Sequence, residues 1–90
     1  MVKATELRRD ATSVVFDVSV REPSGETRHE VSVKLADLAR LARKEESPAH
    51  FVERCFDFLL ERESKESILR RFDVSVIGTY FPEFEKTIKL

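Results

Sequence analysis

The sequence predicts an α+β fold, with an N-terminal antiparallel β-hairpin or three-stranded meander followed by three to four α-helices packed on one face. Two observations predict it. Residues 14–20 and 27–35 alternate side chains with the period of two that half-buried strands show. From residue 35 onward, apolar side chains instead recur every three or four positions, as on one face of a helix. Strands followed by helices within 90 residues indicate a single α+β domain covering residues 1–90.

The predicted hairpin joins two alternating runs, Val14–Val20 and Thr27–Leu35. Between them, the segment Glu22–Glu26 contains a proline, which presets one backbone angle, and a glycine, which accepts a positive φ, so it is expected to turn. An isolated hairpin is only marginally stable in water. The segment Val2–Arg8 is therefore expected to add a third strand through a turn at residues 9–12, although it would also tolerate a helix.

Two helices are predicted in the middle of the chain. A short amphipathic helix starts at Leu35 and ends near Glu46. Ser47 then fits the N-cap of the next helix and Pro48 its first position, which is a favoured pair. This second helix carries a wide apolar stripe and is expected to form the centre of the core, with Phe58 beside the stripe; the stripe consists of Phe51, Val52, Cys55, Phe56, Leu59 and Leu60.

Helical spacing also extends into the last third of the chain. Ile68, Leu69 and Phe72 continue the stripe of the second helix, or begin a new helix capped by Ser64. Asp73 is expected to cap a last helix, which contains Val74, Ile77 and Phe81. Pro82 ends that helix and begins a final turn with Phe84 and Ile88 on one side.

The charge balance bears on partners and location. With 16 basic and 17 acidic residues, the net charge is −1, so no overall field attracts nucleic acid or an anionic membrane. No apolar run approaches the roughly 20 residues of a membrane span. The single cysteine, Cys55, excludes an intramolecular disulfide and suits a reducing compartment. We therefore expect a cytoplasmic protein with no membrane contact.

Few residues carry chemistry. The two histidines, His29 and His50, fall on a strand and on a helix start, and His50 shares a helix face only with Glu53. A zinc site needs three or four converging ligands, so no metal is expected. Cys55 lies within an apolar stripe, where a thiol is inert. No glycine-rich phosphate loop is present. We expect no enzyme activity and no cofactor.

The densest aromatic cluster lies near the C-terminus. One interpretation is a clasp over the core, and the other is an exposed patch that binds a protein partner or a second copy of the chain. A small core with many aromatic residues often completes its burial by oligomerisation. The leading hypothesis is therefore a non-catalytic protein–protein interaction module, with a homodimer as one form. The predicted contact residues are Phe58, Tyr80, Phe81 and Phe84.

The segment from His29 to Glu63, HEVSVKLADLARLARKEESPAHFVERCFDFLLERE, resembles ribbon-helix-helix repressors and antitoxins. It reads as a short strand, a helix, a capped loop and a longer helix. In that family, strands from two chains pair antiparallel and enter the major groove of DNA. The resemblance implies an alternative function as a DNA-binding regulator or antitoxin, in which Arg28 and Lys34 would contact nucleic acid.

The second half, FLLERESKESILRRFDVSVIGTYFPEFE, looks like a run found in small uncharacterised prokaryotic proteins. This resemblance implies a small stand-alone prokaryotic domain. It implies no activity, substrate or cofactor. The pieces that carry it are Phe58–Glu63, Lys65–Leu69, Phe72-Asp73 and Tyr80–Glu83.

Overall fold

The computed structural model describes all residues from 1 to 90 and has an α+β architecture. Its four-stranded sheet has the order β1-β2-β3-β4. The strands are β1 (Val2–Arg9), β2 (Ser13–Glu22), β3 (Gly25–Lys34) and β4 (Arg71–Asp73). The first three form the predicted antiparallel meander, and β4 returns from the helical half to pair parallel with β3. The predicted fold class is therefore confirmed, and the sheet has one strand more than predicted.

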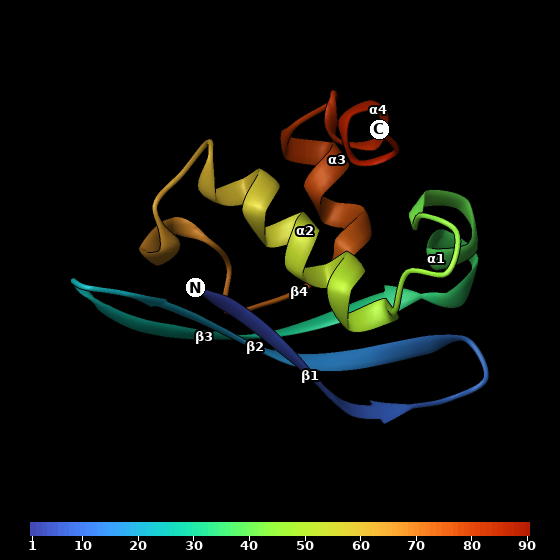
Figure 1. Cartoon of the computed structure of the whole chain (residues 1–90), viewed down its shortest axis with the longest axis horizontal. Coiled ribbons are helices and arrows are strands. Elements are labelled where there is room, and N and C mark those ends of the chain that lie inside the picture. Colours follow the sequence, from blue (N-terminus) through green and yellow to red (C-terminus); the bar gives the residue numbers. More distant parts are fainter.

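All helices lie on the same side of this sheet, and α2 crosses it (Figure 1). The α-helices are α1 (Leu35–Leu41), α2 (Pro48–Leu60), α3 (Ile77–Tyr80) and α4 (Phe84–Ile88). Two 3₁₀ turns, η1 (Lys65–Ser67) and η2 (Val74–Val76), flank β4. The core therefore forms one layer between the sheet and α2, with α3 and α4 closing it on the far side of α2.

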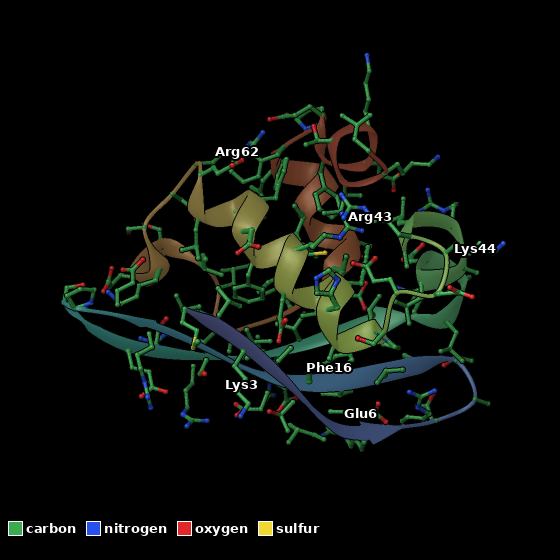
Figure 2. All side chains as sticks on the ribbon, viewed as in Figure 1. Lys3, Glu6, Phe16, Arg43, Lys44 and Arg62 are labelled. Atoms are coloured by element: carbon green, nitrogen blue, oxygen red, sulfur yellow. The ribbon has the colours of Figure 1, made fainter.

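The alternation of the strands separates a buried face from an open one. Six side chains of β2 and β3 are completely buried under α2: Val14, Phe16, Val18, Val20, Val31 and Val33. The open face carries charged residues that neutralise each other, such as Arg28, whose guanidinium lies 2.6 Å from the carboxylate of Asp17. Lys3 projects from this face (Figure 2). The hydrophobic driving force therefore acts on one face only.

Helix α2 begins where the sequence predicts. The hydroxyl of Ser47 accepts a hydrogen bond from the backbone N–H of His50 at 3.1 Å, and Pro48 occupies the first helical position. The carboxylate of Glu53 accepts the backbone N–H of Ala4 at 3.0 Å. This bond satisfies a donor on the outer side of edge strand β1, because only the inner side of β1 pairs with β2.

The predicted helix through Ile68, Leu69 and Phe72 does not form. The chain makes the short turn η1 and then extends into β4. Long-range contacts override the local spacing. The backbone N–H of Glu30 donates to the backbone carbonyl of Arg70 at 2.8 Å, and the ammonium of buried Lys65 donates to the hydroxyl of Ser24 at 2.7 Å. These bonds dock the segment onto β3 and onto the β2–β3 turn.

Two further boundaries differ from the prediction. Helix α1 ends at Leu41, because the next residue, Ala42, has an extended backbone. In the loop that follows, Glu45 has a φ of 65° and the Glu46 side chain accepts the N–H of Arg43 at 2.9 Å. Asp73 caps as predicted, accepting the N–H of Ser75 at 3.0 Å, but the element that it caps is the 3₁₀ turn η2.

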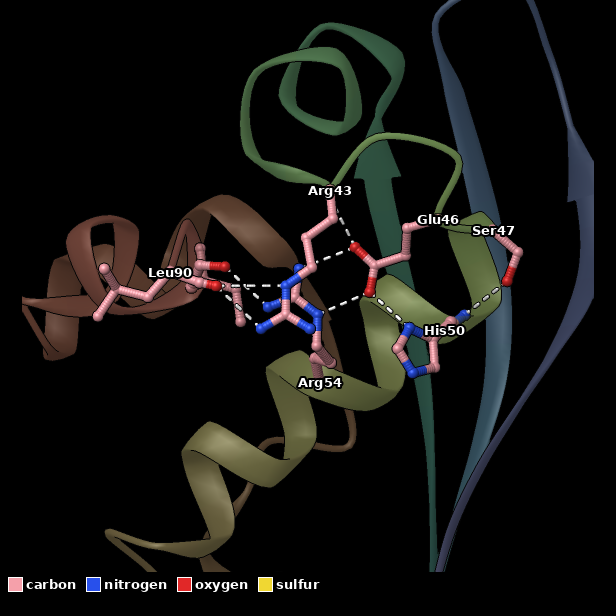
Figure 3. Close-up of polar contacts among 7 residues, drawn as sticks. Arg43, Glu46, Ser47, His50, Arg54 and Leu90 are labelled. Atoms are coloured by element: carbon pink, nitrogen blue, oxygen red, sulfur yellow. Dashed lines mark hydrogen bonds and ion pairs between the residues drawn. The ribbon is translucent and has the colours of Figure 1, made fainter.

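A buried ion pair joins the loop before α2 to the end of the chain. The guanidinium of Arg54 donates to both carboxylate oxygens of Glu46, at 2.6 and 2.8 Å, and to the carbonyl of Ile88 at 2.7 Å. The guanidinium of Arg43 donates to the carbonyl of Leu90 at 2.9 Å. Figure 3 shows these groups converging between α2 and the C-terminal segment. The network holds α4 against α2.

Candidate functional site

Two of the four predicted contact residues lie in the core. Phe58 is 4% exposed, because Phe84 and Phe81 pack edge-on against its ring at 5.0 and 5.9 Å and Arg62 covers it at 3.6 Å. Figure 2 places Arg62 at the C-terminal end of α2. Phe84 is buried as well. Neither side chain offers a surface to a partner, and the prediction that they do is corrected.

Tyr80 and Phe81 behave differently. The side chain of Tyr80 is 65% exposed, and Phe81 is half-buried. Both line an apolar groove with a volume of about 310 Å³, which we call the Tyr80 groove. Eight of its ten lining residues are hydrophobic; the full set is Leu59, Glu63, Ser67, Ile68, Leu69, Phe72, Val76, Ile77, Tyr80 and Phe81.

The groove forms where three parts of the chain meet. Its base consists of buried side chains from the end of α2, the segment before β4 and the start of α3: Leu59, Ile68 and Ile77. Two large apolar side chains stand at its rim, Leu69 at 48% exposure and Tyr80 at 65%. Exposed apolar groups around an apolar depression are typical of interaction sites. The fold therefore provides an apolar depression with two exposed apolar side chains at its rim.

His29 positions one wall of this groove. Its Nδ1 lies 2.8 Å from the carbonyl of Leu69, which can only accept, so Nδ1 carries the proton. Its Nε2 lies 2.9 Å from the hydroxyl of Thr27, which then donates to it. Burial lowers the pKa of His29, and the nearby positive charge of Arg70 acts in the same direction, against the raising effect of the Leu69 carbonyl. The neutral ring therefore connects β3 to the backbone of Leu69, two residues before β4.

The cysteine and the second histidine have structural surroundings as well. Cys55 is fully buried, and burial raises the pKa of its thiol far above the usual range, because a thiolate would lose its hydration. His50 lies on the surface, with Nδ1 in contact with the carboxylate of Glu46. No group of three His, Cys, Asp or Glu side chains converges in a way that could hold a metal ion.

The nucleic-acid contacts implied by the first resemblance lie on strand β3. Arg28 pairs with Asp17 and Glu26 on the open sheet face, and Lys34 pairs with Asp73 at 3.0 Å. Strand β3 itself is bonded on both sides, to β2 along its length and to β4 at three residues. Neither edge of β3 is free over those three residues to pair with a second chain.

Sequence reasoning missed Leu69 and Phe72 as surface-forming residues, because helical spacing placed them in a stripe. A signal was present. Residues 72–76, Phe-Asp-Val-Ser-Val, alternate apolar and polar side chains with the same period of two as β2 and β3. That alternation indicates extended chain, and its first two residues lie in β4, whereas Val74–Val76 form the 3₁₀ turn η2.

Comparison of the chain with protein-family models, with curated proteins and with solved structures found no match. The two resemblances described for the sequence therefore stay predictions. None of the helices has both the length and the apolar character needed to cross a bilayer.

Proposed function

We propose that this protein is a non-catalytic interaction module that binds a protein partner through the Tyr80 groove. One observation carries the proposal: Leu69 and Tyr80 expose large apolar surface at the rim of an apolar groove, whereas five of the seven phenylalanines are buried and the other two, Phe72 and Phe81, are half-buried in its lining. Covering such side chains removes apolar surface from water, and tyrosine is enriched at the centres of interfaces.

The groups that could carry chemistry have structural roles, which supports the non-catalytic part of the proposal. The thiol of Cys55 is buried and held protonated, and both ring nitrogens of His29 are engaged. The open, half-exposed rim of the groove also favours a macromolecule, since small-molecule sites enclose most of their ligand. We further propose a cytoplasmic location, in keeping with a lone cysteine that is buried and reduced.

The test is selection from a random dodecapeptide library displayed on phage, with the immobilised wild-type protein and with the variant Tyr80→Ser. We expect wild type to enrich peptides with large apolar side chains. The variant Tyr80→Ser should bind these peptides with at least tenfold lower affinity. The exposed residue Thr79 provides a matched control, since Thr79→Ser alters a neighbouring side chain that does not line the groove. Peptides that bind wild type and Tyr80→Ser equally would contradict the proposal.

A second copy of the chain is the other protein that this surface could accept. Sedimentation velocity of wild type and Tyr80→Ser over a range of concentrations distinguishes the two partners. A monomer leaves the groove to a different protein. A dimer that Tyr80→Ser dissociates assigns the groove to self-association, whereas a dimer that Tyr80→Ser does not affect uses another surface.

A further inference from the structure

The Tyr80 groove has one charged residue in its lining, Glu63. This residue follows α2 directly in the chain, and its side chain is half-buried. Its carboxylate has no ion pair and no hydrogen bond from any other residue, although the structure has fifteen ion pairs in total. Glu63 therefore carries an uncompensated negative charge at the edge of an apolar depression.

The cations that neighbour Glu63 in the chain form no ion pair with it. Arg62 pairs with Glu83 at 3.1 Å and with Glu61 at 3.2 Å, while its guanidinium covers the ring of Phe58. Lys65 is buried and pairs with Glu22 and Glu66. Arg70 follows the rim residue Leu69 but does not line the groove. No cation of this chain thus forms an ion pair with Glu63.

A partner that covers the groove would remove water from Glu63. Removing water from an unpaired carboxylate opposes binding, whereas a cation placed against it offsets that loss and also rejects partners with acidic side chains. A partner with an apolar side chain next to an ammonium or a guanidinium would fill the groove with the apolar group and place the cation against Glu63 at its edge.

We propose that the partner of the Tyr80 groove is a protein segment that presents a large apolar side chain with a lysine or arginine within about four residues of it. This inference rests on the proposed function and specifies the chemistry of the partner. Charge pairs at the rim of an interface are worth up to about 1 kcal/mol, which corresponds to roughly fivefold in affinity. The preference for a basic residue is therefore expected to be about two- to fivefold and to weaken at high salt.

The experiment compares peptides selected by phage display with wild type, Glu63→Gln and Glu63→Lys. For wild type we expect Lys and Arg to be enriched within four positions of the apolar anchor. Glu63→Gln should remove this enrichment, and Glu63→Lys should replace it with enrichment of Asp and Glu. The matched control is Glu61→Gln, because Glu61 lies two residues away but pairs with Arg62 outside the groove, and it should keep the basic preference.

The outcomes separate the inference from the proposed function. Peptides that need Tyr80 but show no charge preference, or the same preference with Glu63→Lys as with wild type, would overturn the basic partner and leave the interaction module standing. Peptides that bind without regard to Tyr80 would overturn both. A wild-type dimer that dissociates in Tyr80→Ser would replace the basic segment with a second copy of the chain. Thermal unfolding of each variant shows whether it is folded before its peptides are compared.

Discussion

The buried carboxylate of Glu46 provides the sharpest test of the fold, through the variant Glu46→Gln. Its side chain is only 4% exposed and accepts two hydrogen bonds from Arg54. These bonds lower the pKa of Glu46 from 4.5 to about 2, against the opposing effect of burial. At about 1.4 kcal/mol per pKa unit, this lowering corresponds to about 3 kcal/mol of folding free energy at neutral pH.

Loss of the charge leaves the guanidinium of Arg54 without its buried partner, and breaking such a pair typically costs about 3–5 kcal/mol. For a domain of this size, each kcal/mol shifts the unfolding midpoint by about 4–8 °C. Glu46→Gln should therefore lower the free energy of unfolding at pH 7 by about 3 kcal/mol and the midpoint by about 12–24 °C. The assays are urea unfolding and thermal unfolding followed by circular dichroism.

The pH dependence follows from the direction of the pKa change. Because the folded-state pKa lies below the unfolded value, the stabilisation is complete well above pH 4.5 and is lost as the pH falls toward 2. Glu46→Gln should lack this part of the acid dependence. The control is Glu85→Gln, since Glu85 pairs with Arg40 at the surface and is half exposed. The reasoning is refuted if both variants lose the same small amount, or if Glu46→Gln keeps the wild-type acid profile.

Three further outcomes are expected. Phe58→Ala should lower the free energy of unfolding by about 3–5 kcal/mol and Tyr80→Ala should change it by less than about 0.5 kcal/mol, because only the first ring is buried; similar urea midpoints would contradict the assigned burial. Cys55 should react with a thiol reagent only after denaturant is added, and rapid labelling of the folded protein would place the thiol elsewhere. The lowered pKa of His29 means that wild type should lose stability as the pH falls below about 6.5, where the unfolded ring gains a proton first. His29→Gln should reduce that loss in urea titrations between pH 8 and 5, and an unchanged slope would exclude His29 as its source.

Local patterns were sufficient to predict the elements that short-range physics controls. Alternation identified β2 and β3, because side-chain direction in a strand repeats every two residues. The Ser47-Pro48 pair located the start of α2, since capping needs only neighbouring atoms. The polar sheet face and the apolar stripe of α2 followed from the same periodicities, so the α+β class was readable from the printed sequence.

The tertiary structure alone decided which apolar residues reach the surface. Phe58 lies beside the helical stripe, yet Arg62 and two distant aromatic rings cover it. Leu69 fits a helical stripe, yet its carbonyl bonds to His29 and its segment leads into β4, so it forms no helix and its side chain stays exposed. Periodicity describes one element at a time, whereas burial depends on which other elements pack against it. The Tyr80 groove, built from three separated parts of the chain, could therefore emerge only from the folded molecule.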